Sequence, residues 1–106
     1  MSHPSKQKGN KLEREVVAMA HLYDLESKRA WGSNGQSNGW HPEVDVMIEK
    51  WRFQCKSRKK LGTVVKPSEH VDGQIIKENR GEIYVVLPLL DLLTLIKTNK
   101  YGNPPV

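Results

Sequence analysis

Hydrophobic positions near the start of the chain follow a helical spacing. Apolar side chains recur every three or four residues, at Leu12, Val16, Met19, Ala20 and Tyr23. This spacing predicts an amphipathic helix. Asn10 stands at the N-cap position, and Glu13 follows it by three residues, as in a capping box. Residues 1–9 are polar and basic, so we predict a flexible basic arm before the helix.

Strand patterns come next. The predicted strands are Leu25–Trp31, Val44–Ile48 and Trp51–Lys56, and the polar, glycine-rich residues 32–39 form a loop after the first. Only Glu49 and Lys50 separate the last two strands, which predicts a hairpin. Because side chains alternate along a strand, one hairpin face carries Val44, Val46, Ile48, Trp51, Phe53 and Cys55. The other face carries Asp45, Gln54 and Lys56, with Asp45 directly opposite Gln54.

After the hairpin, the pattern predicts another short strand and a second helix. Thr63–Val65 is expected to form the strand. The helix is expected to begin at Pro67 and to end before Gly81, a residue that commonly stops helices. Its apolar side consists of Val71, Ile75 and Ile76.

The last third of the chain is strongly apolar. Ile83–Leu87 is a nearly continuous apolar run, which predicts a buried strand. Pro88–Thr98 predicts a leucine-rich helix whose surface must be buried or meet a partner. We predict a flexible tail over residues 101–106. We therefore predict one α/β domain, residues 1–106, in the order αβββαβα, with a central mixed sheet flanked by helices.

Composition restricts the class of protein. The chain is 37% hydrophobic and 27% charged, which is typical of soluble globular domains. No apolar run is long enough to cross a bilayer, and the N-terminus lacks the apolar segment of a secretory signal. We therefore expect an intracellular, cytoplasmic protein without a membrane partner. Cys55 is the single cysteine, which excludes an internal disulfide.

The positive charge is concentrated in the first part of the chain. The net charge is +5. Up to Lys60 there are 12 lysines and arginines against 7 acidic residues, and after Lys60 there are 5 of each. A polyanionic partner such as nucleic acid accounts for this imbalance, and a solubilising basic surface is the alternative.

The chemistry of the hairpin points to phosphodiester hydrolysis. A carboxylate in an apolar strand is costly to bury, so Asp45 marks either a functional site or a buried ion pair with Lys56. Mg²⁺ prefers few protein ligands besides water and phosphate oxygens. Asp45, together with the backbone carbonyl of Cys55 and with Glu13 from the first helix, is such a sparse oxygen set. Lys56 is placed to orient water or to neutralise developing charge.

These residues, taken in order, resemble a nuclease family. The segments that carry the resemblance are Lys8-Gly9, Leu12-Glu13-Arg14, Ser33 in its glycine-rich loop, Pro42 with Asp45, and Gln54-Cys55-Lys56-Ser57-Arg58. The chain is similar to archaeal-type Holliday junction resolvases of the PD-(D/E)xK nuclease superfamily, from about Lys8 to Ile96. The resemblance implies a restriction-endonuclease-like core. It also implies a homodimeric endonuclease that uses Mg²⁺, with Mn²⁺ as a substitute, to cut four-way DNA junctions.

The resemblance assigns roles to individual residues. Glu13, Asp45 and Gln54 match the metal-binding and catalytic positions, with the Cys55 carbonyl as a further metal ligand, and Lys56 matches the catalytic lysine. The residues expected to contact DNA are Lys6, Lys8, Lys11, Arg14, Arg29, Ser33, Arg58, Lys59 and Lys60. The leucine-rich C-terminal helix is a candidate dimer surface.

The chain departs from the family pattern at two positions. Pro42 and Asp45 are separated by two residues instead of being adjacent. Gln54 stands where the motif has glutamate, which keeps an oxygen donor but loses the charge that holds a cation. Three hypotheses follow: a junction-cutting endonuclease, a related nuclease acting on flaps or nicked DNA, and a structure-specific DNA-binding module that does not cut. Three tryptophans are candidates for stacking on unpaired bases, namely Trp31, Trp40 and Trp51, with core packing as the alternative for Trp51.

Overall fold

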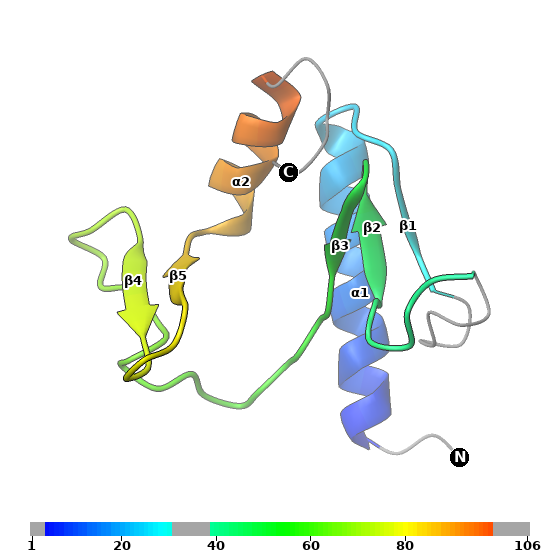
Figure 1. The fold of residues 1–106 in the computed structure, drawn as a ribbon. Helices are drawn as coiled ribbons and strands as arrows, with labels where there is room; N and C mark the ends of the chain where they lie inside the picture. The colour runs from blue at the N-terminus through cyan, green and yellow to red at the C-terminus, as the bar shows by residue number, and fades with distance from the viewer. Residues whose placement is uncertain (1–3, 31–38, 99–106) are drawn as a thin grey trace. The chain divides into compact units, whose positions relative to one another are not determined.

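The structure is a computed structural model that describes residues 4–30 and 39–98. Its described part is mixed α/β, with two helices and two small antiparallel sheets (Figure 1). The chain divides into two compact units. The first unit comprises the chain up to Ser57 together with the residues from Leu93 onward, and the second unit is Arg58–Leu92.

The first helix, α1, is longer than its apolar spacing predicted. It spans Pro4–Leu22, so the prediction of a flexible arm over residues 1–9 is wrong from Pro4 onward. Proline is well tolerated in the first turn of a helix because its missing N–H would have no partner there. Lys6 and Lys8 are good helix formers, and the helix continues through Asn10 instead of beginning after it.

Three short strands form the sheet of the first unit. They are β1 (Ser27–Arg29), β2 (Val46–Ile48) and β3 (Trp51–Phe53), antiparallel in the order β1-β2-β3. The predicted hairpin is confirmed, because Ile48 pairs with Trp51 across the two-residue turn. The strands are shorter than predicted, however, so residues 54–56 lie beyond the end of β3.

The core of the first unit lies between α1 and the inner face of this sheet. The helix contacts β1 and β2, and it runs along the sheet in Figure 1. Within the first unit, the buried apolar side chains are Val16, Ala20, Leu25, Ala30, Val44, Val46, Ile48, Leu93 and Ile96. Trp51 and Phe53 stack on the same face of β3, with ring centroids 6.4 Å apart. The predicted apolar face of the hairpin is therefore the face that packs inward.

The second unit contains a strand where a helix was expected. Instead of a helix from Pro67, the chain forms β4 (Gln74–Lys77), which pairs antiparallel with β5 (Ile83–Val86). Isoleucines are favoured in strands, where a branched side chain packs well against a paired neighbour. Gly73 allows the close approach of the two strands, because a Cβ there would lie 2.6 Å from Leu87 Cδ2.

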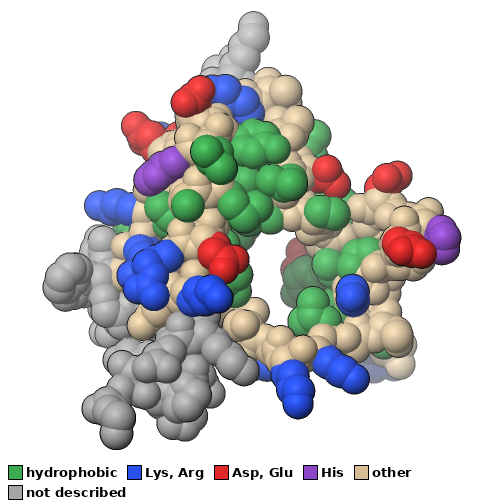
Figure 2. Space-filling model, turned by 180° about the vertical axis from the view of Figure 1, so that it is seen from behind, with side chains coloured by type: hydrophobic (Ala, Val, Ile, Leu, Met, Phe, Trp, Pro, Cys, Tyr) green, Lys and Arg blue, Asp and Glu red, His purple; other side chains and the backbone are tan. Residues whose placement is uncertain are grey.

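Two further expectations for the second unit are wrong. Thr63–Val65 forms a turn, in which the N–H of Val65 donates to the carbonyl of Gly62 at 3.0 Å. The strand at Ile83 is present and pairs with β4. It is not buried, since Tyr84 and Val85 remain more than half exposed. The described strands thus form two small antiparallel sheets instead of one central mixed sheet. Hydrophobic side chains open to solvent are visible in Figure 2.

The leucine-rich C-terminal helix is confirmed. The helix α2 spans Leu89–Thr98, with Leu93 and Ile96 buried and Leu90 and Leu95 exposed. The exposed leucines are available for contact with a partner, and the homodimer stays a prediction. Among the described residues, neither helix combines the length and the apolar character that a bilayer span requires.

Candidate functional site

Asp45 directly precedes β2, the central strand of the sheet, and its backbone is hydrogen-bonded to the chain at the ends of β1 and β3. Its carbonyl accepts a hydrogen bond from Ala30 N–H at 2.8 Å, and its own N–H donates to the carbonyl of Phe53 at 2.9 Å. The carboxylate oxygen Oδ2 accepts a hydrogen bond from Cys55 N–H at 2.8 Å. The half-buried Asp45 side chain is therefore held beside the backbone that follows β3.

Gln54 was predicted to lie directly opposite Asp45, but the registered pairs in the described part of this hairpin do not include these two residues. The last registered pair is Val46 with Phe53, and one further step leads to Asp45 and Gln54. The N–H of Asp45 donates to the carbonyl of Phe53, the residue before Gln54, and the regular pairing of the two strands ends at Val46 and Phe53. The exposed Gln54 lines a shallow hollow of about 340 Å³ together with His41, Glu43, Val44, Arg52 and Phe53.

Glu13 is a buried carboxylate on α1, with 3% of its surface exposed. It precedes Val16 and Ala20 by three and seven residues, so the three side chains share the stripe of the helix that packs on the sheet. The same spacing is present in the sequence, but a capping role for Glu13 obscured it. Burial places this carboxylate against the sheet instead of in solvent.

The charges of Asp45 and Glu13 both act on the thiol of Cys55. Burial raises the pKa of the Cys55 thiol, and the negative charges of Asp45 and then Glu13 raise it further, to about 11 from the ordinary value of 9.0. Two carboxylates from distant parts of the chain therefore concentrate negative charge at one point. Such a point favours a cation.

This pKa predicts a thiol that reacts slowly. Because the folded-state pKa is raised, the neutral thiol stabilises the folded chain below pH 9.0, and this contribution is lost as the pH rises through about 11. We expect Cys55 to alkylate with iodoacetamide about a hundredfold more slowly at pH 8 than an ordinary cysteine. Intact-mass measurement of the rate from pH 7 to 11 checks this, with the protein in denaturant as control. A folded-state midpoint near 9 would contradict it.

Arg29 joins the other side of this site. One guanidinium nitrogen, Nη2, donates to Oδ1 of Asn10 at 3.2 Å. Asn10 lies three residues before Glu13 on the same side of α1. The Nε of Arg29 is buried and has no hydrogen-bond partner among the residues that the structure describes. The sequence identified Arg29, but it assigned Asn10 only to capping.

Lys56 does not form the structural ion pair that was the alternative explanation for Asp45. Its side chain is exposed, and within residues 4–30 and 39–98 no ion pair joins it to Asp45. The described residues also contain no group of three or more histidine, cysteine or acidic side chains able to hold a metal ion. Any cation here would have two carboxylates and neutral oxygens as protein ligands.

The predicted DNA-contacting residues are distributed over both units. Lys11 and Arg14 are exposed neighbours on α1, and the backbone of Lys6 and Lys8 belongs to the same helix. The three basic residues that begin the second unit, Arg58, Lys59 and Lys60, are exposed. Ser33 lies outside the described residues, as does Trp31.

Comparison with known proteins adds no relative: no protein-family model, no curated protein and no solved structure matches the chain.

Proposed function

We propose that this chain is a structure-specific DNA endonuclease that cleaves four-way junctions, with a restriction-endonuclease-like core of the PD-(D/E)xK type. The observation that carries the proposal is the convergence of Glu13 and Asp45 beside Cys55. In the motif that the sequence resembles, an acidic residue of the first helix and the central aspartate act together. A purely structural role gives no reason for two carboxylates from distant parts of the chain to act on the same thiol.

We expect Mg²⁺ to be the metal of this site, with Mn²⁺ as a substitute. Mg²⁺ takes oxygen ligands and keeps several waters, which suits a set of Glu13, Asp45, the Cys55 carbonyl and Gln54. When bound, such a metal lowers the pKa of water and stabilises charge on phosphate oxygens. The buried Glu13 and the half-buried Asp45 provide negative charge where water is partly excluded. Electrostatic attraction is stronger there than at an exposed surface.

Cationic side chains of the first unit would hold the DNA. We expect Arg29, whose Nη2 donates to Asn10, to hold a phosphate, and the exposed Lys11 and Arg14 to extend the contact along α1. The exposed Lys56 orients the attacking water or neutralises charge on the phosphate. Two copies of this site in a homodimer would cut two strands of a junction.

A second candidate is a DNA-binding module that recognises branched DNA without cutting it. Gln54 favours this candidate, because its side chain is exposed and carries no charge. A metal held by one fewer carboxylate binds more weakly. Phosphate contacts by lysine and arginine do not need the metal, so binding would persist.

The decisive experiment is cleavage of a labelled four-way junction with Mg²⁺ or Mn²⁺ by this protein and its Gln54→Glu variant. We expect the variant to reach half-maximal rate at about tenfold lower Mg²⁺, because the added carboxylate strengthens metal binding. Linear duplex of the same sequence is the substrate control. Gln54→Ala is the protein control, since it removes the oxygen donor without adding charge.

The outcomes separate the candidates. If both proteins cut the junction and spare the duplex, the proposed endonuclease is supported and Gln54 acts as a tolerated ligand. If only the Gln54→Glu variant cuts, this chain is the binding module. Cutting of flaps or nicked duplex in preference to the junction would assign the related nuclease activity. If neither protein cuts although both bind the junction, the enzyme assignment falls.

A further inference from the structure

A pocket of about 470 Å³ lies beside β1 and β2, away from the carboxylate site. Its lining residues are His21, Glu26, Ser27, Lys28, Trp40, Met47 and Glu49, all within the first unit. Lys28 and Met47 are paired in register, and by strand alternation they project from the face opposite the inward-packed Val46 and Ile48. This volume falls within the range of small-ligand sites.

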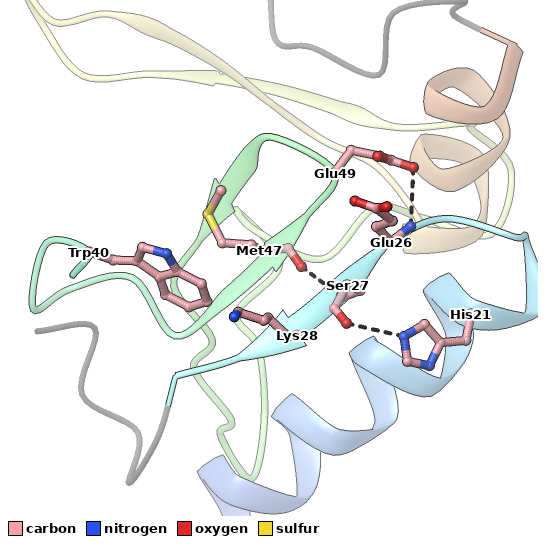
Figure 3. Close-up of a pocket in the computed structure, with 7 residues that line it drawn as sticks. All are labelled: His21, Glu26, Ser27, Lys28, Trp40, Met47 and Glu49. Atoms are coloured by element: carbon pink, nitrogen blue, oxygen red, sulfur yellow. Dashed lines mark hydrogen bonds between the residues drawn. The ribbon is translucent and has the colours of Figure 1, made fainter. Parts of the chain in front are cut away.

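One end of the pocket presents an aromatic ring beside an exposed ammonium group. Trp40 is half-buried, and the ammonium of Lys28 lies 5.9 Å from its ring centroid. Figure 3 shows these two side chains pointing toward each other at one end of the pocket. Lys28 itself is exposed, so its ammonium can move from the ring into solvent at low cost, which leaves the ring free for a flat ligand.

The other end presents two carboxylates. The N–H of Glu26 donates to Oε1 of Glu49 at 3.1 Å, and the N–H of Glu49 donates to the carbonyl of Glu26 at 2.7 Å. These reciprocal bonds hold Glu49 in a left-handed conformation, φ 53°, at the turn of the hairpin. The two side chains lie near each other in Figure 3. This end of the pocket therefore accepts hydrogen bonds.

Between the two ends of the pocket, polar groups already hydrogen-bond to one another. Ser27 Oγ–H donates to the carbonyl of Met47 at 2.7 Å, and Nε2 of His21 lies 3.1 Å from the carbonyl of Ser27. These bonds tie the end of α1 to β1 and β1 to β2, so the pocket is largely formed before a ligand enters. The recognition groups that remain are the Trp40 ring, the Lys28 ammonium and the glutamate oxygens.

A ligand that matches this pocket has a flat aromatic body, hydrogen-bond donors on one edge and an anionic group. We propose that the pocket binds one unpaired nucleotide whose base carries an exocyclic amino group. The base stacks on Trp40, its amino group donates to the exposed carboxylate of Glu26, and Lys28 pairs with the phosphate. Carboxylates accept hydrogen bonds from the amino group of cytosine, whereas thymine would present a carbonyl oxygen to them.

This inference rests on the proposed function only in that both concern DNA, and it names what the protein reads in a branched substrate: an unstacked base. Base–aromatic stacking does not depend on a metal or on cutting. The pocket can therefore be tested with single strands, independently of junction cleavage.

The test is fluorescence anisotropy with 5′-labelled hexamers of deoxycytidine and of deoxythymidine at pH 7.5, without divalent metal. We expect the full chain to bind the cytidine hexamer about tenfold more tightly than the thymidine hexamer. Trp40→Ala should weaken binding of both hexamers about tenfold, because stacking is lost. Glu26→Gln, a change at an exposed side chain, should reduce the preference for cytidine toward equal affinity.

Matched controls are available in the second unit. Tyr84→Ala removes an exposed aromatic ring elsewhere, and Glu69→Gln removes an exposed carboxylate; neither should change binding. Equal affinity for the two hexamers in the unaltered protein, or a preference that survives Glu26→Gln, would overturn the proposal. A junction that is cut while the hexamers show no preference overturns the pocket alone. Hexamer preference without junction cleavage overturns the endonuclease alone.

Discussion

Asp45→Asn is expected to lower the rate of junction cleavage by about a thousandfold, equivalent to about 4 kcal/mol of lost transition-state stabilisation. Asparagine keeps the oxygen that accepts the hydrogen bond from Cys55 N–H, so the local backbone is retained. It removes the negative charge that would hold the metal. Junction binding should be equal or slightly tighter, because a charge that repels phosphate is gone.

The measurement compares single-turnover cleavage rates in whichever parent, this chain or its Gln54→Glu variant, cuts the junction faster. Glu43→Gln is the matched control, since it removes an exposed carboxylate two residues away and should leave the rate unchanged. Junction binding in the absence of metal shows that the variant is folded. Cleavage by Asp45→Asn at close to the parental rate would rule out Asp45 as the metal ligand.

Leu93→Ala is expected to destabilise the first unit by about 2–5 kcal/mol, the usual cost of emptying a buried leucine site. Leu93 is completely buried, so the substitution leaves a cavity that its neighbours fill only in part. For a domain of this size the midpoint of thermal unfolding should fall by roughly 10–30 °C. Thermal and urea unfolding, followed by circular dichroism, measure the effect.

The control comes from the same helix and the same substitution. Leu95 is 57% exposed, so Leu95→Ala should cost only about 0.5 kcal/mol. If Leu95→Ala is as harmful as Leu93→Ala, the exposed leucines of α2 are buried in solution, and concentration-dependent unfolding would then identify the predicted homodimer. Equal and small effects of both substitutions would contradict the position of Leu93 in the core.

Local sequence determined those elements whose signals act over a few residues. The hairpin followed from strand alternation on either side of a two-residue turn, and α2 followed from a run of leucines ended by polar residues. Asp45 stood out because a carboxylate in an apolar strand is costly unless it has a partner or a function. Glu13 carried a similar signal, its spacing to Val16 and Ala20, although a capping role explained it equally well.

Tertiary structure decided the features that depend on pairing between distant segments. The spacing of Val71, Ile75 and Ile76 fits the apolar side of a helix. In the structure, β4 instead forms hydrogen bonds and side-chain contacts with β5. The spacing of apolar residues within β4 does not predict this pairing. Alternation predicted Asp45 on the hairpin face opposite Cys55, but the carboxylate accepts a hydrogen bond from Cys55 N–H, and the charge of Glu13, from another element, acts on the same residue. That convergence depends on how α1 packs against the sheet, which is set by the shape and burial of both.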